Sequence, residues 1–527
     1  MTGTATDAGR VIGEEVLAAG TAVAPRECRS RGRSSTCAGC PGRDTGIETL
    51  LEELEGLRKE NERLREENER LRKENAKLEG RTRRNSRNSS LPPSSDPPSA
   101  PEREKKARSE RKPGGQPGHR GTSRELAPPE AVHEVILHFP EKCAGCGKDV
   151  EESEKRQDPA PAPEHRHQQW EIPPIEPVIT EHQCHTAECR GCGTVTRATL
   201  PESVARSAFG PNLMALVVLL TGVYRLSKRA VANLLSDVLG MVVSVGSISN
   251  IEKRVSRALA MPVEILKVMV RMAKVVYADE TTWKERAKRM YIWTAVTCFG
   301  AVYLIRNSRA SQVARELLGD LKKYGKYVIT DRYSGYSWIP LRMRQICWAH
   351  LIRDFKWIED SGGGAGRIGK DLLDCAGQLF GLWHRVRDGT LKRSSFRTLV
   401  SPIRKRIRAL LEEGAALDVD GVSGMCRAML RVYPAFYTFV RVEGVEPTNN
   451  QVERRQRHPA MWRRVSFGTW SRRGSVYVER ILSTVATLRI QGRDILSYLR
   501  EASRAALAGE QAPFLVPFDE ETDDKAA

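Results

Sequence analysis

The stretch KVVYADETTW (274–283) decides the fold, because the sequence pattern changes at Lys274 from the spacing of helices to that of strands. Two more runs rich in β-branched and aromatic residues follow after short turns, RMYIWTAVTC (289–298) and GAVYLIRN (300–307). Together the three runs predict an antiparallel meander. The amphipathic run 311–325 then predicts a helix, and KYVITDRYSGY (326–336) predicts a fourth strand.

Three strands, a helix and another strand begin a ribonuclease-H-like fold, whose core we expect in two parts, 273–350 and 441–504. Asp279 and Glu280 are neighbours on one strand and point to opposite faces, so only one of them can face a shared site. Asp331 stands where the fourth strand gives way to a loop, which exposes a polar side chain to substrate. Taken singly, each such aspartate is better explained as a turn cap.

The stretch VEPTNNQVERRQRH (445–458) contains Glu453, which opens a run rich in arginine: from Glu453 to Arg473 there are seven arginines and no second carboxylate. Thr448 and Gln451 have the spacing of a capping box, which predicts that a helix starts there. Glu453 is then either an ion-pair partner or a ligand for a cation, while the arginines face phosphates. The candidate DNA contacts in this region are Arg454, Arg455, Arg457, Arg463 and Arg464.

Composition indicates a multidomain protein with a polyanionic partner. The chain has 527 residues, too many for one core, and a net charge of +19, which favours nucleic acid over a merely basic soluble protein. The N-terminus lacks the pattern of a signal peptide, and the apolar run 213–220 is too short to span a bilayer. We therefore expect a cytoplasmic, nucleoid-associated protein without a membrane. Its twelve cysteines are expected to be metal ligands or buried thiols.

Residues 47–79 predict a parallel, dimeric coiled coil. Leucines recur every seven residues from Leu50 to Leu78, and Asn61, Asn68 and Asn75 occupy the other core position of the heptad. Glutamates and arginines flank this seam so that they pair across a homodimer, and asparagine in the seam fixes two strands in register. A single solvated helix would not explain these matched charges.

Residues 126–200 predict a zinc-binding domain. Cys143, Cys146, Cys189 and Cys192 form two CxxC pairs separated by 42 residues, each followed by a glycine that can adopt positive φ. The extended stretches 131–139 and 176–184 are expected to be the strands of a zinc ribbon. Four protein ligands leave no open position, so this zinc would be structural; coincidental CxxC pairs are the alternative.

The remaining segments are helical or irregular. Residues 201–272 predict helices compatible with a DNA-binding helix-turn-helix, with a serine capping the second helix. A helical insertion is expected at 351–440; Cys347 and His350 just before it lack a second ligand pair, and we expect them to be structural or to shape the site. The basic, Pro/Gly-rich linker 80–125 either tracks phosphates, with Lys112 and Arg120 as contacts, or is a solvated tether. Residues 1–46, with Cys28, Cys37 and Cys40, and the acidic tail 505–527 are expected to be disordered.

Several ordered motifs resemble the insertion-sequence-66 family of bacterial transposases. They are NSRNSSLPPSSD (85–96), RKPGGQPGHRGT (111–122), VYADETTW (276–283), VITDRYSGY (328–336), ICWAHLIRDF (346–355), GVEPTNNQVERRQRH (444–458), WRRVSFGT (462–469) and GSVYVERILSTVATLRIQGRDILSYL (474–499). The two cysteine pairs match the zinc-binding region of that family. Val452 and Gln456 depart from its usual NN-x-AER-x-LR pattern, whereas both asparagines and the glutamate are present.

The resemblance implies a DDE transposase whose catalytic residues are Asp279, Asp331 and Glu453. These would hold two Mg²⁺ or Mn²⁺ ions, which carboxylate oxygens suit. The expected partners are double-stranded DNA, as element ends and as target, a second copy of the chain, and accessory proteins of the same element. The alternatives are a catalytically inactive DNA-binding derivative and a related metal-dependent nuclease that cuts without joining.

Overall fold

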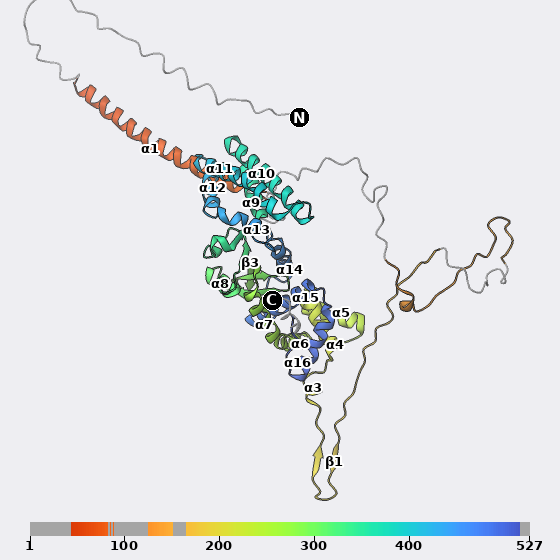
Figure 1. The fold of residues 1–527 in the computed structure, drawn as a ribbon. Coiled ribbons are helices and arrows are strands. Elements are labelled where there is room, and N and C mark those ends of the chain that lie inside the picture. The colour runs from red at the N-terminus through yellow and green to blue at the C-terminus, as the bar shows by residue number, and fades with distance from the viewer. Residues whose placement is uncertain (1–43, 83–84, 86–87, 89–124, 151–164, 517–527) are drawn as a thin grey trace, which may run out of the picture. The chain divides into compact units, whose positions relative to one another are not determined.

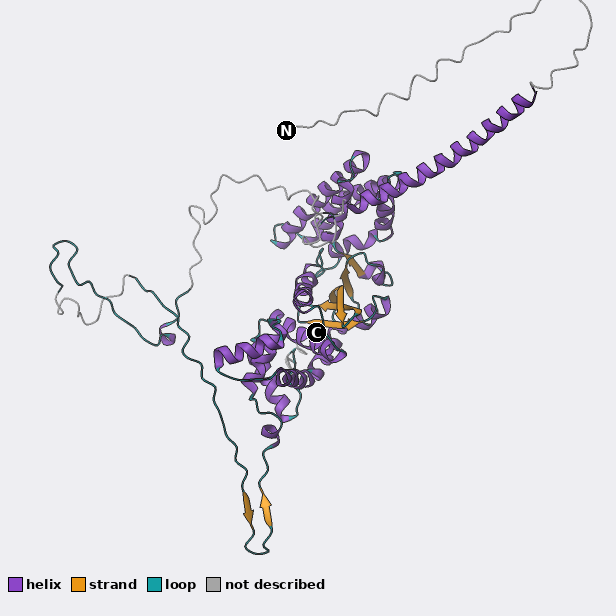
Figure 2. Ribbon diagram, turned by 180° about the vertical axis from the view of Figure 1, so that it is seen from behind, coloured by secondary structure: helices purple, strands orange, loops and turns teal. Residues whose placement is uncertain are grey.

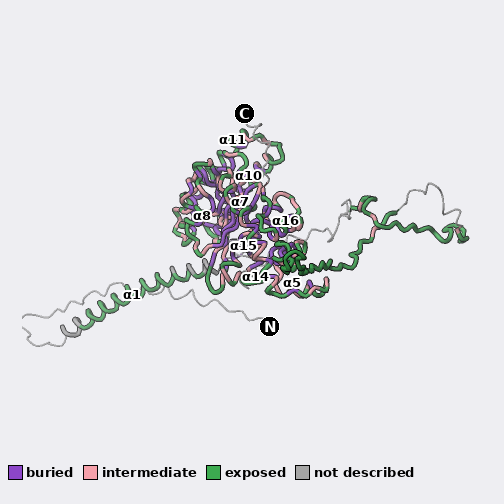
Figure 3. The backbone as a smooth tube through the Cα atoms, turned by 90° about the horizontal axis from the view of Figure 1, so that it is seen from below, coloured by how far each residue is buried: buried purple, intermediate pink, exposed green. Residues whose placement is uncertain are grey.

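The computed structural model describes residues 44–82, 85, 88, 125–150 and 165–516, which divide into two compact units at Asn75. In the first unit α1 (Asp44–Thr82, which ends in the second) is a straight helix (Figure 1). Its seam leucines are exposed, Leu57 by 59% and Leu64 by 46%, and Figure 3 shows the helix almost wholly exposed. A helix agrees with the heptad pattern, and an unpartnered leucine seam is what one chain of a coiled coil presents. The second chain stays a prediction.

The second unit centres on a five-stranded mixed sheet in the order β5-β4-β3-β6-β7. Strand β4 is antiparallel to both of its neighbours, whereas β6 and β7 run parallel to β3. The strands are β3 (Val275–Glu285), β4 (Lys288–Val296), β5 (Ala301–Arg306), β6 (Tyr327–Thr330) and β7 (Arg344–Ile346). The first four match the predicted strands; β7 is only three residues long and carries no periodic signal.

Strand β5 is an outer strand of the sheet, and helix α15 (Arg472–Ile490) covers its free side. The backbone N–H groups of Ala301, Tyr303 and Ile305 point away from β4 and would otherwise lack partners. They donate to Thr487 Oγ1, Ser483 Oγ and Glu479 Oε1, at 3.1, 3.0 and 2.7 Å. Polar side chains every four residues on the helix thus match N–H groups every two residues on the strand, which closes an edge that could otherwise pair with another chain.

The two faces of the sheet carry different helices. Helix α8 (Ser311–Leu318) packs against β4 on one face. Helix α14 (Asn450–Ser466) packs against β3 and β4 on the other. Figure 2 shows the strands enclosed by helices.

The helices before the sheet pack with those at the C-terminus into one continuous core. Ser227 and Ser244 cap α5 and α6, as the serine pattern predicted for the second helix, and Gly240 ends α5 with φ +64°. The bounds are α3 (Glu202–Ala205), α4 (Pro211–Val218), the π-helix η3 (Leu219–Val223), α5 (Lys228–Leu239), α6 (Val245–Ala258), α7 (Ala260–Met272) and α16 (Ile495–Ala508).

The segment between β7 and α14 is helical, as expected, and surrounds the buried ring of Trp348. Its indole N–H donates to the Phe436 carbonyl at 2.7 Å, and three aromatic rings from two other elements, α10 and η6, contact it edge-on. The elements are α9 (Trp348–Glu359), α10 (Gly363–Arg387), α11 (Arg393–Ala416), α12 (Val422–Arg431), η6 (Tyr433–Tyr437) and α13 (Thr438–Arg441).

Two predictions of local structure are wrong. Stretches 131–139 and 176–184 form no strands; the short strands are β1 (Thr186–Glu188) and β2 (Val195–Arg197), which flank the second cysteine pair. Both stretches are rich in β-branched residues, but no neighbouring strand forms hydrogen bonds with their backbones. Their side chains are also not packed in a core; Val178, for example, is 95% exposed. The expected disordered tail also begins too early: α16 continues to Ala508, and Ala512 and Leu515 are buried because their apolar side chains join the core.

No helix in the described part of the chain is long and apolar enough to cross a membrane.

Candidate functional site

Asp279 and Asp331 occupy equivalent positions on neighbouring parallel strands. Tyr277 of β3 pairs with Ile329 of β6, and each aspartate follows two residues later. Asp331 comes directly after the last residue of β6, where its Oδ1 accepts the backbone N–H of Tyr333 at 3.0 Å. The parallel pairing therefore places side by side two carboxylates that are far apart in the sequence.

The strand register decides which face Asp279 occupies. Asp279 pairs with Thr294, which in turn pairs with Tyr303, so the three side chains share a face. The hydroxyl of Tyr303 donates to the backbone carbonyl of Arg455 in α14 at 3.2 Å. Asp279 consequently faces the helix that carries Glu453.

Glu280 points to the opposite face and is fully engaged there. Its Oε1 accepts Arg309 at 2.6 and 2.9 Å, and its Oε2 accepts the Tyr336 hydroxyl at 2.7 Å. Burial, and then the charge of Asp331, raise the pKa of Glu280 to about 7 despite these donors. Of the two neighbouring carboxylates, Asp279 is the one left for a site beside α14.

Helix α14 is attached to β3 at both ends. At its start, the Asn449 amide donates to the Ala278 carbonyl at 2.9 Å, next to Asp279. After its end, Thr469 N–H donates to the Lys284 carbonyl at 2.9 Å, and Gly468 lies so close that a Cβ there would sit 2.2 Å from the same oxygen. These contacts position the helix, and with it Glu453, along β3.

The predicted capping box at Thr448 is wrong. Helix α14 begins at Asn450 with Asn449 as its N-cap residue, and no side chain caps it. The reason is that the Asn449 side chain, which is 1% exposed, is used for the bond to β3 instead of for the helix.

Pro459 lies inside α14 and cannot donate the usual helical hydrogen bond to the carbonyl of Arg455. The Tyr303 hydroxyl, which donates to that carbonyl, takes its place. A residue that would weaken an isolated helix thus creates a bond between α14 and the sheet.

The electrostatics show that the carboxylates are neighbours. Burial raises the pKa of Asp279 well above its usual range, and the charges of Glu280, Asp331 and Glu453 raise it further. Bringing like charges together costs free energy unless a cation or a proton offsets it. The group of carboxylates beside α14 therefore favours the binding of a cation or a proton.

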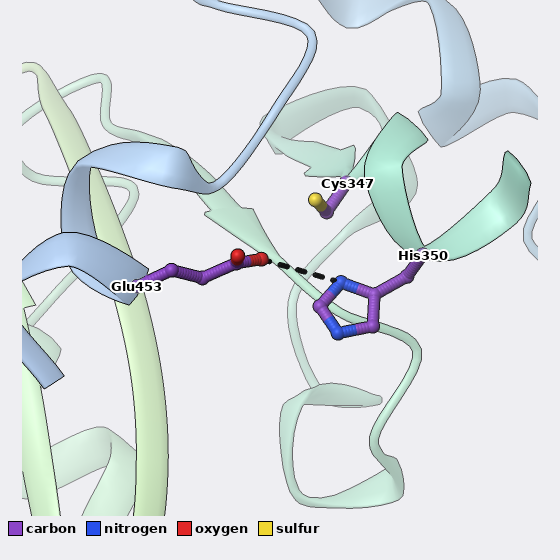
Figure 4. Close-up of side chains that lie close together, drawn as sticks. All are labelled: Cys347, His350 and Glu453. Atoms are coloured by element: carbon purple, nitrogen blue, oxygen red, sulfur yellow. Dashed lines mark ion pairs between the residues drawn. The ribbon is translucent and has the colours of Figure 1, made fainter. Parts of the chain in front are cut away.

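Glu453 lies close to Cys347 and His350, which we expected to be structural or to shape the site but did not pair with Glu453. Its Oε1 lies 3.7 Å from Nδ1 of His350, in the first turn of α9, and Cys347 lies beside them (Figure 4). Among the described residues this is the one group of three potential ligands whose atoms all lie within 4.8 Å of one another. The three predicted carboxylates are not drawn together that closely. The spacing of Cys347 and His350 drew attention to them in the sequence, but Glu453 lies about a hundred residues further on and could not be recognised as their partner.

Cys347 serves as a structural link within this group. Its buried sulfur accepts the backbone N–H of Asn449 at 3.1 Å. Burial, and to a smaller extent the charge of Glu453, raise the pKa of the thiol to about 11. Cys347 therefore stays a neutral thiol at neutral pH and holds the start of α14 against the start of α9.

The loop after Asp331 is fixed to the same helix. Arg332 donates to Asp354 of α9 at 2.5 Å, one turn beyond His350. Arg344, 2% exposed, donates to the Asp331 carbonyl at 2.7 Å and to Thr330 Oγ1 at 2.9 Å. Asp331 and His350 are thus held by one rigid network.

Two of the predicted DNA-contacting arginines line a pocket of about 240 Å³ beside the site. Arg454, Arg455 and Arg489 surround it together with His458, and no carboxylate lines it. Burial, and then Arg225 and Arg489, lower the pKa of His458 to about 4, so its ring is neutral. The pocket is therefore positively charged through its arginines and suits an anionic ligand.

The other predicted arginines differ among themselves. Arg457 and Arg464 are exposed on α14. Arg463 donates to the Thr282 carbonyl and hydroxyl of β3, so its guanidinium attaches the helix to the sheet rather than facing solvent. Lys112 and Arg120, like Cys28, Cys37 and Cys40, lie outside the described residues.

Each cysteine pair forms its own tight turn. Gly147 N–H donates to the Cys143 carbonyl and Gly193 N–H to the Cys189 carbonyl, at 2.9 and 2.8 Å. Both glycines have positive φ, +73° and +69°, as their spacing predicted. All four thiols are free and exposed, and the structure does not gather them into one cluster. A zinc site at Cys143, Cys146, Cys189 and Cys192 stays a prediction.

Part of the chain, including the site, matches a known protein family. The family model described as the IS66 family of transposases matches residues 206–477, just over half of the chain, and includes the site. A second model, described as a family of unknown function (DUF6444), matches residues 45–125. No curated protein matches the chain.

Proposed function

The chain belongs to the IS66 family of transposases, and from that premise we propose that it cuts and joins DNA at the ends of an insertion sequence by metal-dependent phosphoryl transfer. The observation that carries the proposal is the arrangement of Asp279, Asp331 and Glu453. Two adjacent strands and one helix bring these carboxylates close enough to raise the pKa of Asp279. The sheet order, with one antiparallel strand among four parallel ones, supports a ribonuclease-H-like core.

The residues present fit divalent cations. Carboxylates that repel one another need positive charge between them, and Glu453 Oε1 is buried without a hydrogen-bond partner among the described residues. Asp279, Asp331 and Glu453 would hold the ions. When bound, such ions activate the attacking oxygen and stabilise the leaving oxygen in an in-line displacement.

The protein itself supplies position and charge. Asn449 and Arg463 attach α14 to β3 and Tyr303 attaches it to β5, which keeps Glu453 on the face of Asp279. Arg454 and Arg455 beside the carboxylates would bind phosphate oxygens and hold the DNA in place. No side-chain nucleophile is required, because water would cut the strand and the freed 3′-hydroxyl would attack the target.

A second copy of the chain, a zinc ion and further DNA contacts complete the proposal. Helix α1 would join two copies of the chain through its leucine seam, and the two cysteine turns would hold a structural zinc ion. Residues 228–258, two capped helices joined by a turn at Gly240, would contact DNA as a helix-turn-helix.

A strand-transfer reaction tests the proposal. Purified protein is mixed with Mg²⁺, labelled DNA carrying the terminal inverted repeats that flank the gene, and a target plasmid. The proposal expects labelled ends joined to the plasmid. Cut ends without joining would indicate a nuclease, and bound but uncut ends would indicate an inactive DNA-binding derivative.

A further inference from the structure

Two potential metal-ligand atoms near the proposed active site face each other. His350 Nδ1 and Glu453 Oε1 lie 3.7 Å apart, and Figure 4 shows their side chains pointing toward one another from α9 and α14. Both atoms are buried, and neither has a hydrogen-bond partner among the residues that the structure describes. Buried polar atoms in folded proteins nearly always have a partner, and a cation bound by both atoms would supply one.

The spacing fits a shared cation better than a direct bond. A hydrogen bond between the two groups would bring their atoms to about 2.7–3.2 Å. Two ligands that each lie about 2.1 Å from one cation, at angles of about 90–120°, are about 3.0–3.6 Å apart. The observed 3.7 Å is just above that range and further still from the distance of a hydrogen bond.

Cys347 does not belong to the ligand set, although its sulfur is within reach. The sulfur already accepts the Asn449 backbone N–H, and the residue is 0% exposed. Its function is to join the two helices that present the other ligands. The Asp354 side chain, held by Arg332, lies one turn further along α9 and fixes the helix that carries His350.

We propose that His350 Nδ1 and Glu453 Oε1 bind one divalent cation together, so that one cation position of the active site has a nitrogen ligand. This inference rests on the proposed function, because Glu453 is one of its three carboxylates. An imidazole ligand favours transition-metal ions over purely oxygen-seeking ones. The position should therefore prefer Mn²⁺ to Mg²⁺ or Ca²⁺.

Pulsed electron paramagnetic resonance of Mn²⁺ bound to the full-length chain tests this directly. An imidazole nitrogen bound to Mn²⁺ modulates the electron spin echo, and labelling histidine with ¹⁵N changes the modulation frequency. The wild type should show the nitrogen signal, and His350→Ala should lose it and bind Mn²⁺ about 10-fold or more weakly. His384→Ala, which alters an exposed histidine of α10, is the matched control and should keep both. His350→Asn, which retains a polar side chain, gives a second variant if the alanine protein does not fold.

Two outcomes separate this inference from the proposed function. A wild-type protein without the nitrogen signal, or a signal that survives in both His350 variants, overturns the inference; if that protein still joins DNA, the proposed function stands. A nitrogen signal that depends on His350 in a protein that joins no DNA supports the inference and counts against the proposed function.

Discussion

The side-chain amide of Asn449 donates a 2.9 Å hydrogen bond to the backbone carbonyl of Ala278, the residue before Asp279. Through this bond, and through the bond from its own backbone N–H to Cys347, Asn449 joins the starts of α14 and α9 to the middle of β3. The residue is almost completely buried at the point where the three proposed catalytic segments meet.

Replacing Asn449 with alanine should therefore affect both stability and activity. The Ala278 carbonyl would lose its side-chain donor in a buried position, which costs about 1–3 kcal/mol of unfolding free energy. Strand transfer should fall more steeply than stability explains, because Glu453 would no longer be held beside Asp279. Asn450→Ala, an exposed neighbour, is the control. Equal strand-transfer activity of the two variants, measured under conditions in which both are fully folded, would show that the Asn449 bond does not position Glu453.

The lowered pKa of His458 leads us to expect that the protein loses stability as the pH falls. Its pKa is about 4 in the folded chain because burial and nearby arginines disfavour its charged form, whereas an unfolded histidine titrates near 6.5. Its contribution to stability is thus present above pH 6.5 and is lost as the pH falls toward 4, since the unfolded state takes up a proton first. The glutamine side chain of His458→Gln does not titrate. The thermal unfolding temperature of this variant should therefore fall less than that of the wild type between pH 7 and pH 4.5. His384→Gln should follow the wild type; a His458→Gln curve parallel to both would refute the assignment.

The proposed coiled coil can be tested by exchanging charges. Replacing Arg58, Arg65 and Arg72 with glutamate places like charges on both sides of a homodimer seam, so this variant should be monomeric in light scattering. Replacing Glu53, Glu60 and Glu67 with arginine should have the same effect. Mixing the two variants should restore a dimer, and EDTA should not dissociate the wild-type dimer. Homodimers formed by either charge variant alone would argue against the seam. So would a dimer formed by a chain that lacks residues 47–79.

The cysteine turns predict one zinc ion per chain. Elemental analysis of the purified protein should give about one equivalent, and Cys143→Ser or Cys189→Ser should remove it. Cys184→Ser removes an exposed thiol outside both turns and should leave the zinc in place. Full zinc content in the Cys143 and Cys189 variants would mean that the two turns do not share a metal.

Local patterns predicted the parts of the fold that depend on neighbours in the sequence. The patterns from Val275 to Thr330 predicted four strands, and a serine, Ser244, marked the start of a helix, because each depends on a few adjacent residues. Strand β7 was not predicted, because its three residues form a strand only against β6. The apolar stretches 131–139 and 176–184 look like strands but find no partner.

The site shows the same division. Asp331 at the end of a strand could be recognised from the sequence, and the resemblance supplied Asp279 and Glu453. The partner of Glu453 could not be recognised, because the helical insertion separates His350 from Glu453 in the sequence and only the tertiary structure brings them together. Asn449 could not be assigned for a similar reason: its side chain caps no helix but bonds to a strand about 170 residues earlier in the chain.

The central claim is that Asp279, Asp331 and Glu453 together perform the chemistry, and the most direct test is strand transfer by Asp279→Asn, Asp331→Asn and Glu453→Gln. Asp320→Asn, an exposed aspartate in a turn, serves as the control. Each of the three variants should bind end DNA as the wild type does and yield no joined product, while the control should join DNA normally. Joined product at wild-type levels from any one of the three would contradict the account.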